Sequence, residues 1–189
     1  MRKIIVSSLL SVDGLISGPG HEMTWTQEIM SDELLQELKR LFVNVDTILL
    51  GRITYRLMHS YCMDPLRIIE QDPIAHYFNR VSKFVFSRTL TQPEWNNTLV
   101  LRRIDRRTIH SLQRKGNGNI AVIGSASIVR TLINLDMVNE FHFFVHPLVL
   151  GKGKPLFQDI RYRHTLMPVR TTIYKNGVLQ LSYQAFTGD

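Results

Sequence analysis

The segment from Asn119 to Asn134, NIAVIGSASIVRTLIN, constrains the fold of this chain more than any other stretch. It begins with apolar and β-branched residues, which predict a strand buried on both faces of a parallel sheet. Gly124-Ser125-Ala126 ends this run, and apolar residues then recur at helical spacings of three and four. A strand, a turn of small residues and a helix together present free backbone N–H groups to an anion such as a phosphate. An ordinary strand-to-helix turn uses the same residues, so this segment alone leaves phosphate binding open.

The rest of the chain repeats the alternation of strand and helix. Apolar runs predict strands at Lys3–Leu10, Asp46–Leu50, Lys83–Phe86, Thr98–Leu101, Glu140–Val145, Leu166–Tyr174 and Val178–Ala185. Helices are predicted after the capping residue Ser31, from Gly51-Arg52, from Pro73 to about Val81, and from Asp105 to Arg114. Asn176-Gly177 joins the last two strands, as is typical of a hairpin. The pattern predicts an α/β fold with a mixed, mostly parallel sheet covered on both faces and antiparallel C-terminal strands.

Two features of the pattern are less regular. The residues from Met63 to Asp72 show no clean period, and we expect an irregular insertion there. No internal repeat or linker marks a second domain, so we expect one domain over residues 1–189.

The composition predicts a cytoplasmic protein. Cys62 is the single cysteine, which excludes an internal disulfide or a multi-cysteine metal site and fits a reducing compartment. Asp13 and the lack of a cleavage site argue against a signal peptide, and no apolar run reaches membrane-spanning length. We therefore expect no membrane partner.

A net charge of +7 suggests an anionic partner, either nucleic acid or a phosphorylated small molecule. The densest basic cluster, from Arg102 to Arg107, has no interleaved aromatic residues and matches no nucleic-acid-binding motif. We interpret it as an exposed surface and expect no nucleic-acid partner.

Three predicted strands end in turns that suit a phosphorylated ligand. These turns are Gly51-Arg52-Ile53-Thr54, Ser87-Arg88-Thr89 and Gly124-Ser125-Ala126. If the strands are parallel neighbours, two guanidinium groups, several hydroxyls and a helix N-terminus meet at one edge of the sheet. A domain specific for NAD places an acid at such a strand end, whereas arginine favours the 2′-phosphate of NADP.

Other candidate chemistry has less support. His142 and His146 would lie about 13 Å apart on a strand, too far to share a metal, so we expect no metal site. No hydrolase motif is present, and Cys62 has no adjacent basic residue to activate it.

The turns form an ordered set that resembles a known family. The set is Ser11-Val12-Asp13-Gly14, Gly51-Arg52-Ile53-Thr54-Tyr55, Phe86-Ser87-Arg88-Thr89-Leu90, Trp95-Asn96-Asn97-Thr98, Ile123-Gly124-Ser125-Ala126, and the run from Val145 to Gly153. Over nearly the whole chain it resembles dihydrofolate-reductase-like proteins related to the C-terminal reductase domain of the bifunctional deaminase-reductase of bacterial riboflavin biosynthesis.

The resemblance implies a three-layer α/β/α reductase fold, NADPH as hydride donor, a pyrimidine- or pterin-type substrate and a homodimer. By position, it implies that Gly51, Arg52 and Thr54 hold cofactor phosphates, that Ser87, Arg88 and Thr89 bind the 2′-phosphate end, and that Gly124, Ser125 and Ala126 bind the pyrophosphate. It places Asp13 against the substrate, as the residue that binds it or relays a proton, and Trp25 in the loop that borders the substrate pocket.

The sequence departs from this family in three ways. The deaminase domain and its zinc-ligand cysteines are absent, and the turn at Gly124 reads Gly-Ser where some relatives have Gly-Gly. Asp32 and Glu33 suit a helix start, which leaves the substrate-binding acid of true dihydrofolate reductases without a match. Two functions therefore remain open: an NADPH-dependent reductase, or a non-catalytic protein that binds a nucleotide or pterin.

Overall fold

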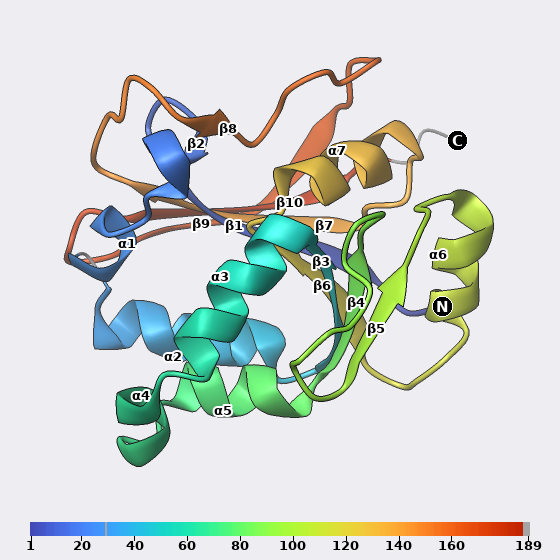
Figure 1. The fold of residues 1–189 in the computed structure, drawn as a ribbon. Coiled ribbons are helices and arrows are strands. Elements are labelled where there is room, and N and C mark those ends of the chain that lie inside the picture. Colours follow the sequence, from blue (N-terminus) through green and yellow to red (C-terminus); the bar gives the residue numbers. More distant parts are fainter. Residues whose placement is uncertain (29, 187–189) are drawn as a thin grey trace.

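The structure is a computed structural model that describes residues 1–28 and 30–186. Within these residues one sheet of eight strands forms the centre of the molecule, in the order β5-β4-β3-β6-β1-β7-β10-β9 (Figure 1). The strands are β1 (Ile4–Ser11), β3 (Val45–Gly51), β4 (Ser82–Phe86), β5 (Thr98–Leu101), β6 (Asn119–Ile123), β7 (Glu140–His146), β9 (Leu166–Ile173) and β10 (Leu179–Ala185).

The sheet is mixed and mostly parallel, as the sequence predicts. The six strands from β5 to β7 run parallel, whereas β10 pairs antiparallel with both β7 and β9. The first strand lies in the interior of the sheet, because Ile4 pairs with Ile120 of β6 and Ile5 with Glu140 of β7.

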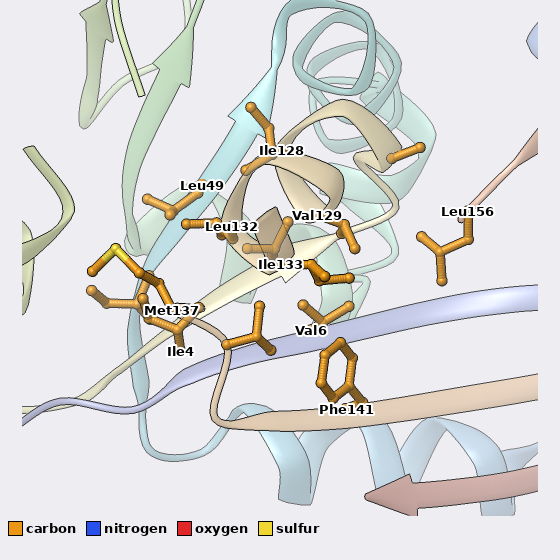
Figure 2. Close-up of a cluster of buried hydrophobic side chains, with 14 of the residues drawn as sticks. Ile4, Val6, Leu49, Ile128, Val129, Leu132, Ile133, Met137, Phe141 and Leu156 are labelled. Carbon is orange, nitrogen blue, oxygen red and sulfur yellow. The ribbon is translucent and has the colours of Figure 1, made fainter. Parts of the chain in front are cut away.

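Helices cover both faces and make three layers (Figure 1). They are α1 (Trp25–Glu28), α2 (Asp32–Phe42), α3 (Arg52–Cys62), α4 (Pro65–Ile69), α5 (Pro73–Arg80), α6 (Arg106–Gln113) and α7 (Ala126–Asn134). The helices α6 and α7 pack on one face, and α2, α3 and α5 pack on the other. Figure 2 shows Ile128, Val129, Leu132 and Ile133 of α7 directed at the sheet.

The opposite face buries a lysine. Lys83 on β4 is 1% exposed, and its Nζ donates to the carbonyls of Phe78 and Val81 at 2.7 and 2.8 Å. The same Nζ lies 4.5 Å from the centre of the Trp95 ring. Burial lowers the pKa of Lys83 to about 8, while the carbonyls and the ring favour the charged amine. Lys83 thus ties the end of α5 to the sheet.

The expected irregular insertion is wrong in part, because it contains the helix α4. Asp64 caps that helix by accepting from the N–H of Leu66, and Pro65 occupies its first turn. Five residues are too few to show a helical period, so the pattern could not reveal it.

The sequence also missed the two-stranded sheet of β2 (Leu15–Ser17) and β8 (Lys154–Pro155) and the short 3-10 helix η1 (Pro19–His21). The pairing brings Gly153 against the backbone of Ser17, where any Cβ would collide with the Ser17 carbonyl. Glycine at 153 is therefore a requirement of this close approach.

Among residues 1–28 and 30–186, no helix is long and apolar enough to cross a membrane.

Candidate functional site

The three predicted phosphate turns lie at one edge of the sheet. Gly51 at the end of β3 pairs with Phe86 at the end of β4, and β6 flanks β3 on its other side. Because these strands are parallel, their carboxyl ends meet at the same edge, where open α/β sheets bind ligands.

A hollow of about 300 Å³ at this edge, the polar cleft, is bounded by the ends of β3 and β6 and the starts of α3 and α7. Its wall combines glycines, hydroxyls and cationic side chains. Six of the residues predicted to bind the cofactor phosphates line it: Gly51, Arg52, Thr54, Gly124, Ser125 and Ala126. His21, Ser127 and Lys154 also line it.

The two helices that begin at the polar cleft, α3 and α7, differ in their capping from α2, α4, α5 and α6. Side chains cap α2, α4, α5 and α6, through Ser31, Asp64, Asp72 and Asp105. In contrast, α3 and α7 have no side-chain cap and no acidic residue in the first turn. Their first N–H groups and positive ends are therefore left for an anion.

The Gly124 turn joins these two helix starts. The Ser125 hydroxyl is buried and accepts from the Gly51 N–H at 2.9 Å, and Thr54 Oγ1 donates to the Gly124 carbonyl at 3.3 Å. Gly124 itself has a φ of 55°, and a Cβ there would meet no heavy atom within 4 Å. The Gly-Ser variant therefore keeps the backbone of Gly124 open and uses Ser125 to tie α7 to β3.

The Ser87-Arg88-Thr89 turn follows β4 but does not line the polar cleft. The Ser87 hydroxyl accepts from the N–H groups of Thr89 and Leu90 at 3.2 and 2.9 Å, so it shapes the turn. Arg88 and Thr89 are exposed.

Arg102, which the sequence assigned to an exposed surface, lies next to this turn and donates from Nη1 to the Arg88 carbonyl. The pairing of Phe86 with Leu101 brings the two strand ends together. Arg102 is thus a cationic neighbour that sequence reasoning missed, and only the order of the strands could have revealed it.

A second hollow, the apolar cavity, adjoins the first. Its volume is about 450 Å³, and it lies between the sheet, α2 and α5. Ile16, Met23 and Gly124 line both hollows, so the two meet at a shared wall. A third, surface groove of about 590 Å³ at α4 and α5 shares only Pro73 with the apolar cavity among the described residues.

Asp13 lines neither hollow within the described residues. Its carboxylate accepts from the N–H groups of Leu150 and Gly151 at 3.1 and 2.8 Å. A hydrogen bond with the Ser11 side chain and these backbone bonds hold the pKa of Asp13 below its ordinary value. Asp13 therefore joins the turn after β1 to the loop after β7. The contact with the substrate that the resemblance implies for Asp13 stays a prediction.

Trp25 is buried at the start of α1, between the cavity residues Met23 and Met30. Its ring packs edge-on against His146 with 5.0 Å between centroids. The indole Nε1 and both ring nitrogens of His146 are buried without a partner among the described contacts, and burial lowers the pKa of His146 to about 4. Trp25 therefore anchors the segment that borders the cavity and does not line it.

The remaining candidates fall outside the site. Cys62 is fully buried, and burial raises the pKa of its thiol to about 12, which removes it as a nucleophile. His142 lies 3.0 Å from the Ser182 hydroxyl. In the described part of the chain, no three His, Cys, Asp or Glu residues are grouped to hold a metal.

The strand order, the antiparallel C-terminal pair and the two joined hollows define an α/β protein of the dihydrofolate-reductase-like class. Residues 2–180 match the model of the RibD C-terminal domain, and the chain belongs to that family. The uncharacterized protein YyaP of Bacillus subtilis (strain 168) is 33% identical over 185 residues, covering 96% of this chain and 94% of YyaP.

Solved structures share the fold at low identity. A putative riboflavin biosynthesis protein from Shewanella sp. PV-4 superposes with a TM-score of 0.81 at 20% identity, covering 98% of this chain and 99% of the other. A dihydrofolate reductase from Enterococcus faecalis, complexed with NADP(H), gives a TM-score of 0.65 at 15% identity, covering 97% and 96% of the two chains. The predicted family and fold class are therefore confirmed.

Proposed function

We propose that this protein is an NADPH-dependent reductase that transfers a hydride to a pyrimidine- or pterin-type heterocycle. The observation that carries the proposal is the pair of uncapped helix starts, α3 and α7, which converge with Arg52 beside a second cavity. The Enterococcus faecalis protein of the same fold is described as complexed with NADP(H).

The polar cleft fits the phosphates of a dinucleotide. Gly124 has open space where a side chain would project, and free N–H groups at two helix starts can replace the water around a pyrophosphate. Arg52 and Thr54 add a guanidinium and a hydroxyl. In this proposal, Arg88 binds the 2′-phosphate beyond the cleft, with Arg102 next to it.

The bound cofactor would supply the hydride, and the protein would position and shield the substrate. The shared wall at Gly124, Ile16 and Met23 supports this arrangement, because ligands in the two hollows would lie side by side. Asp13 then acts as a positioning residue, because its carboxylate holds the loop after β7.

The test separates binding from catalysis. Binding to the protein should enhance the fluorescence of NADPH in a titration. The absorbance of NADPH should then fall when a substrate from a panel of pterins and aminopyrimidines is added and the cofactor is oxidised. If NADPH does not bind, the proposal fails. If NADPH binds but no member of the panel oxidises it, the non-catalytic binding function is favoured.

Asp13→Asn distinguishes two roles for this carboxylate. It should leave kcat near that of the parent and raise KM, because the amide oxygen still accepts one of the two N–H groups. A collapse of kcat at saturating substrate would instead make Asp13 part of the chemistry.

A further inference from the structure

The residues that line the apolar cavity indicate which class of substrate it can bind, which membership of the family does not. Its floor is the middle of β1, where Ser7 and Leu9 face α2, and Ile123 of β6. A volume of about 450 Å³ is in the range of cavities that bind compounds of a few fused rings.

Hydrocarbon and aromatic side chains make most of the wall. On the helices and on the segment around α1, this wall includes Met23, Met30, Leu38, Phe42, Val43, Pro73, Ile74 and Phe78. Tyr77 also lines the cavity, but its hydroxyl donates to the Val45 carbonyl at 2.9 Å and is already used.

The described lining residues include no carboxylate. The nearest acid along α2, Glu37, is directed away from the cavity toward the C-terminal strands. It accepts from Gln180 at 3.2 Å and lies 3.7 Å from Arg170. Asp32 and Glu33 occupy the first turn of α2, as the sequence predicts, and do not line the cavity either. A cationic ring edge would therefore have no counter-charge in this cavity.

Cations are equally scarce in the described wall. Lys39 is its single charged member, and it is exposed at the rim. The cationic residues Arg52 and Lys154 instead line the polar cleft. Because burying an unpaired charge is costly, a phosphorylated substrate is poorly matched to this cavity.

We propose that the apolar cavity binds an uncharged ring compound of the pyrimidine or pterin type that carries no phosphate group, with Ser7 as its polar contact on the floor. This inference rests on the proposed function, because the ring is the hydride acceptor that faces the cofactor. The inference narrows the substrate to compounds with neither a positive charge, which would need a carboxylate on α2, nor a phosphate, which would need a cation in the cavity.

The test uses three probes with related isoalloxazine or alloxazine rings and different tails. Lumichrome has no tail, riboflavin has a neutral ribityl chain, and FMN adds a phosphate. NADPH binding is measured first, and the polar cleft is then saturated with NADP⁺ before the fluorescence of each probe is titrated. We expect lumichrome to bind, and FMN to bind at least tenfold more weakly than riboflavin. A smaller difference, or tighter binding of FMN, overturns the inference.

Failure of this inference is distinguishable from failure of the proposed function. If NADPH binds but lumichrome does not, the inference is wrong and the cofactor site stands. If NADPH does not bind, the proposed function is wrong.

Variants locate the bound probe. Ile74→Asp puts a charge into the cavity wall and should weaken lumichrome at least tenfold, while NADPH affinity is retained. The control is Ile69→Asp on α4, where the isoleucine is 76% exposed and lines neither hollow. This variant should keep the parent affinities for both lumichrome and NADPH. If Ile74→Asp does not fold, Val43→Asp at the exposed rim replaces it, and unchanged lumichrome binding in the folded variant overturns the inference.

Lys39→Ala tests the remaining cation. The ratio of FMN to riboflavin affinity should stay within twofold of the parent value. A tenfold loss of FMN affinity alone would make Lys39 a phosphate anchor and overturn the inference.

Discussion

The polar cleft and the apolar cavity share Gly124, Ile16 and Met23 but are built in opposite ways. The polar cleft is made of backbone: two uncapped helix starts, a glycine turn and a few hydroxyl and cationic side chains. The apolar cavity is made of side chains from the segment around α1, from α2 and from α5. A site made of backbone depends on the fold, so a family can retain it while its sequences diverge. A site made of side chains can change its ligand by single substitutions.

The largest expected effect is at the shared wall. In Gly124→Val, a β-branched residue at a φ of 55° would project into open space between the hollows. We expect loss of NADPH binding and of lumichrome binding, measured by fluorescence titration. Gly177→Val, in the hairpin turn between β9 and β10, is the control, since Gly177 also has a positive φ of 83° and lines neither hollow. It should lose stability but retain both ligands, and retained binding in Gly124→Val would contradict the shared wall.

Arg88→Ala should affect one cofactor only. A hydrogen bond to a charged group contributes roughly 1.5–3 kcal/mol, so the variant should bind NADPH about ten- to a hundredfold more weakly. NADH lacks the 2′-phosphate and should bind as before, and lumichrome should not respond. Titration of the variant with both cofactors at fixed salt tests whether Arg88 contacts the 2′-phosphate. Arg163→Ala, at another exposed arginine, is the control. Parallel losses of NADPH and NADH would show that Arg88 does not contact the 2′-phosphate.

His146 should make the fold sensitive to acid. Burial lowers its pKa from 6.5 to about 4, so the unfolded chain binds more protons than the folded chain between these values. The free energy of unfolding should therefore fall as the pH drops from about 6.5 to 4, by up to about 3 kcal/mol at about 1.36 kcal/mol per pKa unit. Urea denaturation of the parent and of His146→Phe measures the difference. Parallel pH profiles for the two proteins would contradict it.

The smallest effect is expected from the hydrogen bond between the Gly51 N–H and the Ser125 hydroxyl, which connects the starts of α3 and α7. Ser125→Ala removes the acceptor of the buried Gly51 N–H, which should lower the free energy of unfolding by about 1 kcal/mol or more. NADPH affinity should fall by less than tenfold, because the backbone of the cleft remains. Ser127→Ala, at an exposed position in the first turn of α7, is the control for urea denaturation. Equal stability of both variants would show that the hydrogen bond contributes little.

The polar cleft was more predictable from the sequence than the apolar cavity. Gly51-Arg52 and Gly124-Ser125 adjoin strong strand patterns, and their chemistry is local. The short elements α4, β2 and β8 were missed because two to five residues carry too little periodicity.

Long-range packing explains the other differences. The contact of Asp13 with Leu150 and Gly151 joins residues far apart in the chain, and so does the contact of Trp25 with His146. The resemblance supplied a role for each, but no local pattern could show which atoms they contact. The direction of Glu37, away from the cavity, likewise depends on how α2 packs against β10.

The interior place of β1 has a consequence for how the chain folds during synthesis. Ile4 and Ile5 leave the ribosome more than one hundred residues before their partners Ile120 and Glu140. The hairpin of β9 and β10, in contrast, pairs residues that are close in sequence. Closing long loops is slow because their entropy cost precedes the contacts that reward it. The nascent chain must therefore keep the apolar strand β1 unpaired until β6 and β7 have been translated, which is the stage at which chaperones protect such segments.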